Sequence, residues 1–123
     1  MVHDLNEKET LNRFQDEGVS LSRSMSVHFS VEENLTTGYA WTLEKAGPCE
    51  GFVSVSESYD APQFDDGLEV AGASGTKYFT FTGQKTGKCT WRAAYARPWE
   101  FDWENRVNNN VQMLEIPITV DNL

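Results

Sequence analysis

The sequence is poor in the side chains on which enzymes, metal sites and nucleic-acid-binding surfaces depend. It contains two histidines and two cysteines, and ten Lys and Arg residues against nineteen Asp and Glu residues, which gives a formal net charge of −9. A chain with this balance has no basic surface with which to bind a phosphate backbone or an anionic membrane. We therefore expect no nucleic-acid partner, no membrane partner, no metal and no cofactor.

Long apolar segments and an export signal are also lacking. The apolar runs are only a few residues long, too short to cross a bilayer, and residues 1–10 show no basic segment followed by an apolar one. As written, the chain predicts a cytoplasmic protein. A lysosomal, phagosomal or secreted location stays open in case a signal peptide has been removed.

What the sequence does have is aromatic residues and period-two alternation of apolar and polar side chains. Four Trp, four Tyr and seven Phe occur, and six segments alternate as half-buried strands do, with no helical pattern between them. Six strands at this spacing predict an all-β, antiparallel sandwich or barrel. The inward-facing residues of the six segments are Met25, Val27, Phe29 and Val31; Tyr39, Trp41 and Leu43; Val53 and Val55; Phe79 and Phe81; Cys89, Trp91, Ala93 and Tyr95; and Leu114, Ile116, Ile118 and Val120.

Two stretches fit this pattern less simply. In residues 1–24, Leu11 and Phe14 have helical spacing whereas Val19 and Leu21 alternate, and we expect one or two short edge strands there. No linker separates this segment from the rest, so residues 1–123 are expected to form a single domain. Pro117 has outward parity in the last segment, and because a strand proline lacks the N–H needed for pairing, we expect that strand at the border of a sheet.

Counting strands places their connections. If each strand runs antiparallel to the one before it, residues 32–38, 59–75 and 96–110 connect strands at one pole of the sandwich, and residues 47–51 and 83–87 connect them at the other. The first pole carries the long, irregular loops, and binding sites are usually built from such loops. We therefore expect function at the first pole.

The three loops at this pole differ in their chemistry. The first is an uncharged turn, and the second has glycines that let another backbone come close, without the helix or lysine of a phosphate-binding loop. The third places Arg and Trp, which are enriched in binding hot spots, around a proline that limits the entropy lost on docking. On composition alone, the first loop can also be a plain turn, and Trp99 and Trp103 can fold back over the core. The loops are Asn34-Leu35-Thr36-Thr37-Gly38-Tyr39, then Gly72-Ala73-Ser74-Gly75, then Arg97-Pro98-Trp99 followed by Phe101 and Trp103.

Cys49 and Cys89 are expected near the opposite pole, both with inward parity. They can form a disulfide, whose closed loop of about forty residues would stabilise the fold by about 3 to 4 kcal/mol, or they can remain two buried thiols. Neither has an evident histidine partner for catalysis. The acidic cluster of Asp65, Asp66 and Glu69 does not match the spacing of a calcium loop, so we interpret it as a solvated face.

Taken together, the three loops resemble those of the chagasin-like family of cysteine-peptidase inhibitors. That family carries an Asn-Pro-Thr-Thr-Gly-Tyr or Phe turn, a Gly-x-Gly-Gly loop and an Arg-Pro-Trp or Phe loop on an immunoglobulin-like β-sandwich. Corresponding segments occur here in the same order, and the resemblance covers roughly residues 25–120. It implies a reversible, tight-binding inhibitor of papain-like (cathepsin-type) cysteine peptidases, not an enzyme, and we expect a monomer.

The resemblance also implies a role for each loop. Residues 34–39 would enter the active-site cleft, with Thr36, Thr37 and Gly38 at the catalytic dyad. Residues 72–75 would offer backbone groups to the strand that the enzyme normally pairs with its substrate. Trp99 would pack on an aromatic patch of the opposite rim, and Arg97 would reach polar or acidic groups nearby.

Two positions depart from the family. Leu35 stands where the family has proline, and Ser74 stands where it prefers glycine. Leu35 also creates an N-glycosylation acceptor at Asn34, and because a glycan there would stand in the middle of the inhibitory edge, we expect active protein to be unglycosylated. The second interpretation of the sequence is an immunoglobulin-like adhesion or carbohydrate-binding module that uses Trp99 and Trp103 as a stacking platform.

Overall fold

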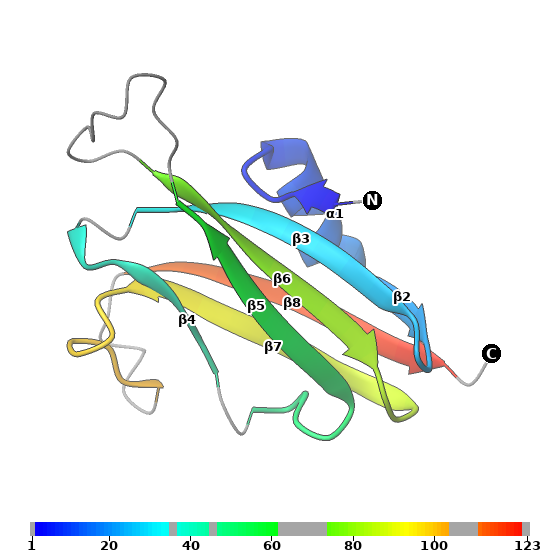
Figure 1. Cartoon of the computed structure of the whole chain (residues 1–123). Coiled ribbons are helices and arrows are strands. Elements are labelled where there is room, and N and C mark those ends of the chain that lie inside the picture. The colour runs from blue at the N-terminus through cyan, green and yellow to red at the C-terminus, as the bar shows by residue number, and fades with distance from the viewer. Residues whose placement is uncertain (1, 35–36, 45–46, 62–73, 104–110, 122–123) are drawn as a thin grey trace.

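The computed structural model describes residues 2–34, 37–44, 47–61, 74–103 and 111–121, which form two layered four-stranded sheets and a helix (Figure 1). This architecture confirms the predicted all-β sandwich. The first sheet has the order β1 (Val2–Asp4), β3 (Ser26–Glu33), β6 (Gly75–Gly83) and β5 (Val53–Asp60). The second sheet has the order β2 (Val19–Ser22), β8 (Gln112–Asp121), β7 (Gly87–Ala96) and β4 (Ala40–Leu43).

The core lies between the two sheets and includes most residues with the predicted inward parity. Met25 is an exception, because it is 53% exposed, and Leu5 of the N-terminal segment is an unpredicted member of the core. Phe29, Phe79 and Phe81 are fully buried in the first sheet. The Trp91 ring of the second sheet meets Phe79 and Phe81 edge-on, with centroids 5.0 Å and 4.8 Å apart, a favoured aromatic geometry. From β8 the core receives Leu114, Ile116, Ile118 and Val120, all buried.

The N-terminal segment adds a short edge strand to each sheet, as expected, but both strands pair in parallel. Strand β1 pairs with β3 and β2 with β8, so the sandwich is not antiparallel throughout. Between them lies α1 (Lys8–Glu17), a helix that the mixed spacing of residues 1–24 did not predict. Its Phe14 ring packs 4.8 Å from His3 and 4.9 Å from Phe29. Gly18 caps the C-terminal end of the helix; its φ of +76° suits glycine, and its N–H donates to the Phe14 carbonyl.

The expected border position of the last strand is wrong, because β8 lies between β2 and β7. Pairing with β2 begins at Ile118, opposite Val19, one residue after Pro117. Pro117 is therefore tolerated because it precedes that ladder. Over the earlier part of β8 the helix takes the place of a strand, and the Glu115 N–H donates to Gln15 Oε1 at 3.3 Å.

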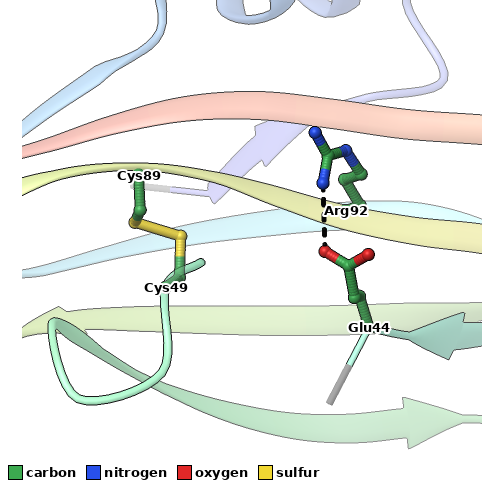
Figure 2. Close-up of a disulfide and its surroundings, with 4 residues drawn as sticks. All are labelled: Glu44, Cys49, Cys89 and Arg92. Carbon is green, nitrogen blue, oxygen red and sulfur yellow. Dashed lines mark hydrogen bonds and ion pairs between the residues drawn. A yellow bond between two sulfur atoms is a disulfide. The ribbon is translucent and has the colours of Figure 1, made fainter. Parts of the chain in front are cut away.

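A disulfide joins the two sheets away from the long loops (Figure 2). Cys49, in the turn before β5, is bonded to Cys89 of β7 across a sequence separation of 40 residues. Beside it, Arg92 Nη1 lies 3.2 Å from Glu44 Oε1 in a partly buried ion pair. Of the two alternatives for these cysteines, a disulfide or two buried thiols, the structure contains the disulfide. No helix in the described part of the chain is long and apolar enough to cross a membrane.

Candidate functional site

The strand pairings bring the ends of three connections together at one pole. Glu33, the last residue of β3, pairs with Gly75, the first residue of β6, and Asp60 at the end of β5 pairs with Thr76. In the second sheet, Ala40 at the start of β4 pairs with Ala96 at the end of β7. The connections β3–β4, β5–β6 and β7–β8 therefore leave the same end of the sandwich (Figure 1), as strand counting predicted.

The first and third loops are in direct contact. Arg97 Nε donates a hydrogen bond to the Thr37 carbonyl at 3.2 Å, and the Arg97 guanidinium lies 5.0 Å from the centroid of the Tyr39 ring, within cation–π range. The Trp99 ring lies against Gly38, where an added Cβ would come within 2.7 Å of Trp99 Cη2. These contacts join two loops that lie 60 residues apart into one surface.

Trp99 is the most exposed large hydrophobic residue of the described chain. Its side chain is 72% exposed, so the alternative in which Trp99 folds back over the core is wrong. The Glu100 N–H donates to the Arg97 carbonyl at 2.9 Å, closing a turn that places Trp99 at its tip. An aromatic ring held at a turn, with most of its surface in water, is available for contact with another molecule.

Trp103 lies differently from Trp99. It is partly buried, and its ring meets Phe101 edge-on at 5.1 Å with an interplanar angle of 87°. Phe101 therefore covers part of Trp103, which is one of the two rings that a Trp99–Trp103 stacking platform would need to expose.

Below the loops, Tyr95 connects the first loop to β7. The Asn34 N–H donates to Tyr95 Oη at 2.9 Å. The Tyr95 ring lies 4.9 Å from Trp41 and 5.5 Å from Tyr39. Aromatic rings therefore fill the base of the first loop, and parity alone had assigned Tyr95 and Trp41 only to the core.

Glu33 is a residue of the site that the sequence analysis missed. Its side chain is only 2% exposed, and Oε2 accepts the Trp41 N–H at 2.7 Å. Trp41 also donates its indole Nε1–H, to the Glu32 carbonyl at 2.9 Å. A sequence signal existed, because Glu33 follows Phe29 and Val31 on the inward parity, where a charged residue is out of place.

The described part of the second loop is its return into β6. Ser74 precedes Gly75, which is buried and where a Cβ would collide with the Asp60 carbonyl oxygen and the Tyr59 hydroxyl. Glycine is required here because two neighbours approach the backbone closely. The remaining predicted site residues Leu35, Thr36, Gly72 and Ala73 lie outside the described residues, as does the acidic cluster of Asp65, Asp66 and Glu69.

The described residues offer no catalytic arrangement. Both cysteines are in the disulfide, so neither is a thiol nucleophile. His28 Nδ1 is bonded to Thr80 Oγ1 at 2.8 Å, and burial, followed by the charge of Arg13, lowers the pKa of His3. Among these residues no three His, Cys, Asp or Glu side chains gather to hold a metal ion. The pole can therefore present a shaped surface, and its described residues include no paired nucleophile and base.

Comparison with known proteins agrees with this geometry. Residues 20–111 match the model of the chagasin family of peptidase inhibitors. Chagasin from Trypanosoma cruzi is 33% identical over 76 residues, a match that covers 59% of this chain and 66% of chagasin. The crystal structure of a cysteine protease inhibitor from Entamoeba histolytica has a TM-score of 0.63 at 20% identity and covers 98% of this chain and 96% of its own. The structure of PbICP-C, solved in complex with falcipain-2, has a TM-score of 0.54 at 22% identity, with 84% and 85% covered. The chain belongs to the chagasin family of peptidase inhibitors, and it is not an enzyme.

Proposed function

We propose that this chain inhibits papain-like cysteine peptidases, reversibly and tightly, by placing its three-loop pole in the active-site cleft. The observation that carries the proposal is the exposed Trp99, held against Gly38 beside the first loop. The family supports inhibition as the activity, and the relative solved with falcipain-2 is itself bound to such a peptidase.

The contacts between the loops supply the physical reason for tight binding. Association loses affinity when flexible side chains and loops must become ordered, by about 0.5–1.5 kcal/mol for each immobilised side chain. Here Arg97 already bonds the Thr37 carbonyl, and Trp99 already rests on Gly38. A pole organised before binding avoids part of that loss.

In this proposal the loops have separate tasks. Residues 34–39 fill the cleft at the catalytic dyad and do not present a peptide bond in the geometry for attack. Residues 72–75 offer backbone groups to the substrate-binding strand of the peptidase. Trp99 packs on the opposite rim, and Pro98 limits the freedom of the turn that carries it.

The proposed function is tested by titrating a papain-like peptidase against a fluorogenic substrate. Near-stoichiometric loss of activity is expected, and Trp99→Ala is expected to weaken inhibition by about 30-fold, the equivalent of about 2 kcal/mol for a hot-spot residue. The matched control is Lys85→Ala, because Lys85 lies over the Phe52 ring in the turn at the other pole. Several such peptidases that keep full activity at micromolar inhibitor would refute the proposal.

A further inference from the structure

We propose that Glu33 is a positioning residue, whose buried carboxylate fixes the roots of the inhibitory loops without touching the peptidase. The inference rests on the proposed function and adds to it a residue outside the three loop motifs. Glu33 is the one charged side chain among the described residues that is buried.

A buried carboxylate at this position requires an explanation. Moving a charge out of water is unfavourable unless it is paired or hydrogen-bonded, and none of the ion pairs found among the described residues involves Glu33. An apolar residue would satisfy the inward parity that Phe29 and Val31 establish on the same strand. The carboxylate therefore has a role that a buried apolar side chain could not fill.

That role is to accept a hydrogen bond between the two strands that flank the first loop. Glu33 precedes the loop and Trp41 follows it, and the 2.7 Å bond from the Trp41 N–H to Glu33 Oε2 joins the two ends. The Trp41 indole Nε1–H donates a second bond, to the Glu32 carbonyl, between the same two strands. Because β3 belongs to the first sheet and β4 to the second, the pair of bonds fixes the span that the loop must cross.

The same backbone position also meets the roots of the other two loops. The Glu33 carbonyl accepts the Tyr59 hydroxyl at 3.4 Å, and Glu33 pairs with Gly75, where the second loop returns to the sheet. The adjacent Asn34 N–H bonds Tyr95, on the strand that leads into the third loop. A shift of Glu33 would therefore be transmitted to all three loops.

The test compares three variants with the wild type against papain, at a temperature where all are folded. Glu33→Val removes the acceptor and fills the space, and Glu33→Gln keeps a neutral acceptor oxygen. Val31→Ala is the matched control, because Val31 is also buried on β3 and its truncation destabilises the core. Hydrogen bonds to charged groups exceed neutral ones in strength, so we expect about tenfold weaker inhibition for Glu33→Val, about threefold for Glu33→Gln, and no change for Val31→Ala.

A second measurement separates positioning from loss of stability. In amide-resolved NMR of the free protein, Glu33→Val should shift the Trp41 amide resonance upfield and reduce its protection from hydrogen exchange, whereas Val31→Ala should leave the resonance in place. Inhibition by Glu33→Val equal to wild type would overturn the inference, as would equal weakening by Val31→Ala. If Glu33→Val does not fold, unchanged inhibition by Glu33→Gln overturns it instead. A wild type that fails to inhibit refutes the proposed function, and this inference with it.

Discussion

Gly38→Ala tests whether the contact between the first and third loops controls inhibition. Gly38 has a φ of +83°, and a Cβ there would lie 2.7 Å from Trp99 Cη2. Carbon atoms in contact are separated by about 3.5–4.0 Å, so the ring must move by about 1 Å. The left-handed conformation costs a non-glycine residue about 1–2 kcal/mol.

Backbone strain at residue 38 and displacement of the Trp99 ring are detected by different measurements. Backbone strain is present in both free and bound inhibitor, so it should lower stability, by about 1–2 kcal/mol or roughly 4–8 °C in Tm for a chain of this size. Displacement of the Trp99 ring affects only the contact with the peptidase, and we expect the inhibition constant to rise about tenfold if Trp99 is a hot spot.

A glycine at the other pole provides the control. Gly51 has a nearly identical φ of +87°, and a Cβ there would meet nothing within 4 Å. Gly51→Ala should therefore lose similar stability and inhibit as wild type does.

The assay is a double-mutant cycle with Trp99→Ala, measured as inhibition constants against papain. In the Trp99→Ala background, Gly38→Ala should have little further effect on inhibition, because the ring that the new methyl group displaces is gone. A tenfold loss that persists in that background would refute the ring contact as its cause. An unchanged inhibition constant for Gly38→Ala alone would refute the reasoning altogether.

Three further predictions concern stability and the first loop. Replacing both Cys49 and Cys89 with alanine should remove about 4 kcal/mol, given the 40-residue separation; urea denaturation measures this, and inhibition by folded protein should not change because the bridge lies away from the loops. Burial lowers the pKa of His3, so the unfolded chain binds more protons, and stability should fall as the pH drops below about 6.5; thermal unfolding of His3→Gln should lack this component, and an identical pH profile would contradict it. Leu35→Pro should tighten inhibition a few-fold by restricting the free loop, by about 0.4–1 kcal/mol, and an equal or weaker inhibition constant would count against preorganisation at this position.

The sequence predicted the sandwich well because its strands bury one face each. In β3, β6 and β8 the period-two pattern identified the core residues, among them Phe29, Phe81 and Ile116, that the structure buries. Strand counting then located the pole, since the direction of each strand follows from the one before it. Neither inference needed tertiary information.

The remaining features depend on contacts between distant segments, which local patterns do not contain. Helix α1 has no fully buried residue, so its apolar stripe was too narrow to identify it. Pro117 is acceptable inside a sheet because the pairing of β2 with β8 begins only at Ile118. At the candidate site, the motif residues were proposed from their sequence. Glu33 was missed because its role depends on Trp41, which approaches only when the two sheets stack.

The two short N-terminal strands have a consequence for how molecules of this protein behave toward one another. A strand at the edge of a sheet presents unpaired N–H and C=O groups, which recruit strands of other chains and lead to aggregation. Strand β1 covers the edge of β3 that faces away from β6, and β2 together with α1 covers the edge of β8 that faces away from β7. A chain that began at Met25 would retain strands β3 to β8 and all three loops. It would expose the edges of β3 and β8 that the N-terminal segment covers, and it should therefore form oligomers detectable by light scattering. The segment that covers these two edges is therefore separate from the three-loop pole, and changes to the loops leave that cover in place.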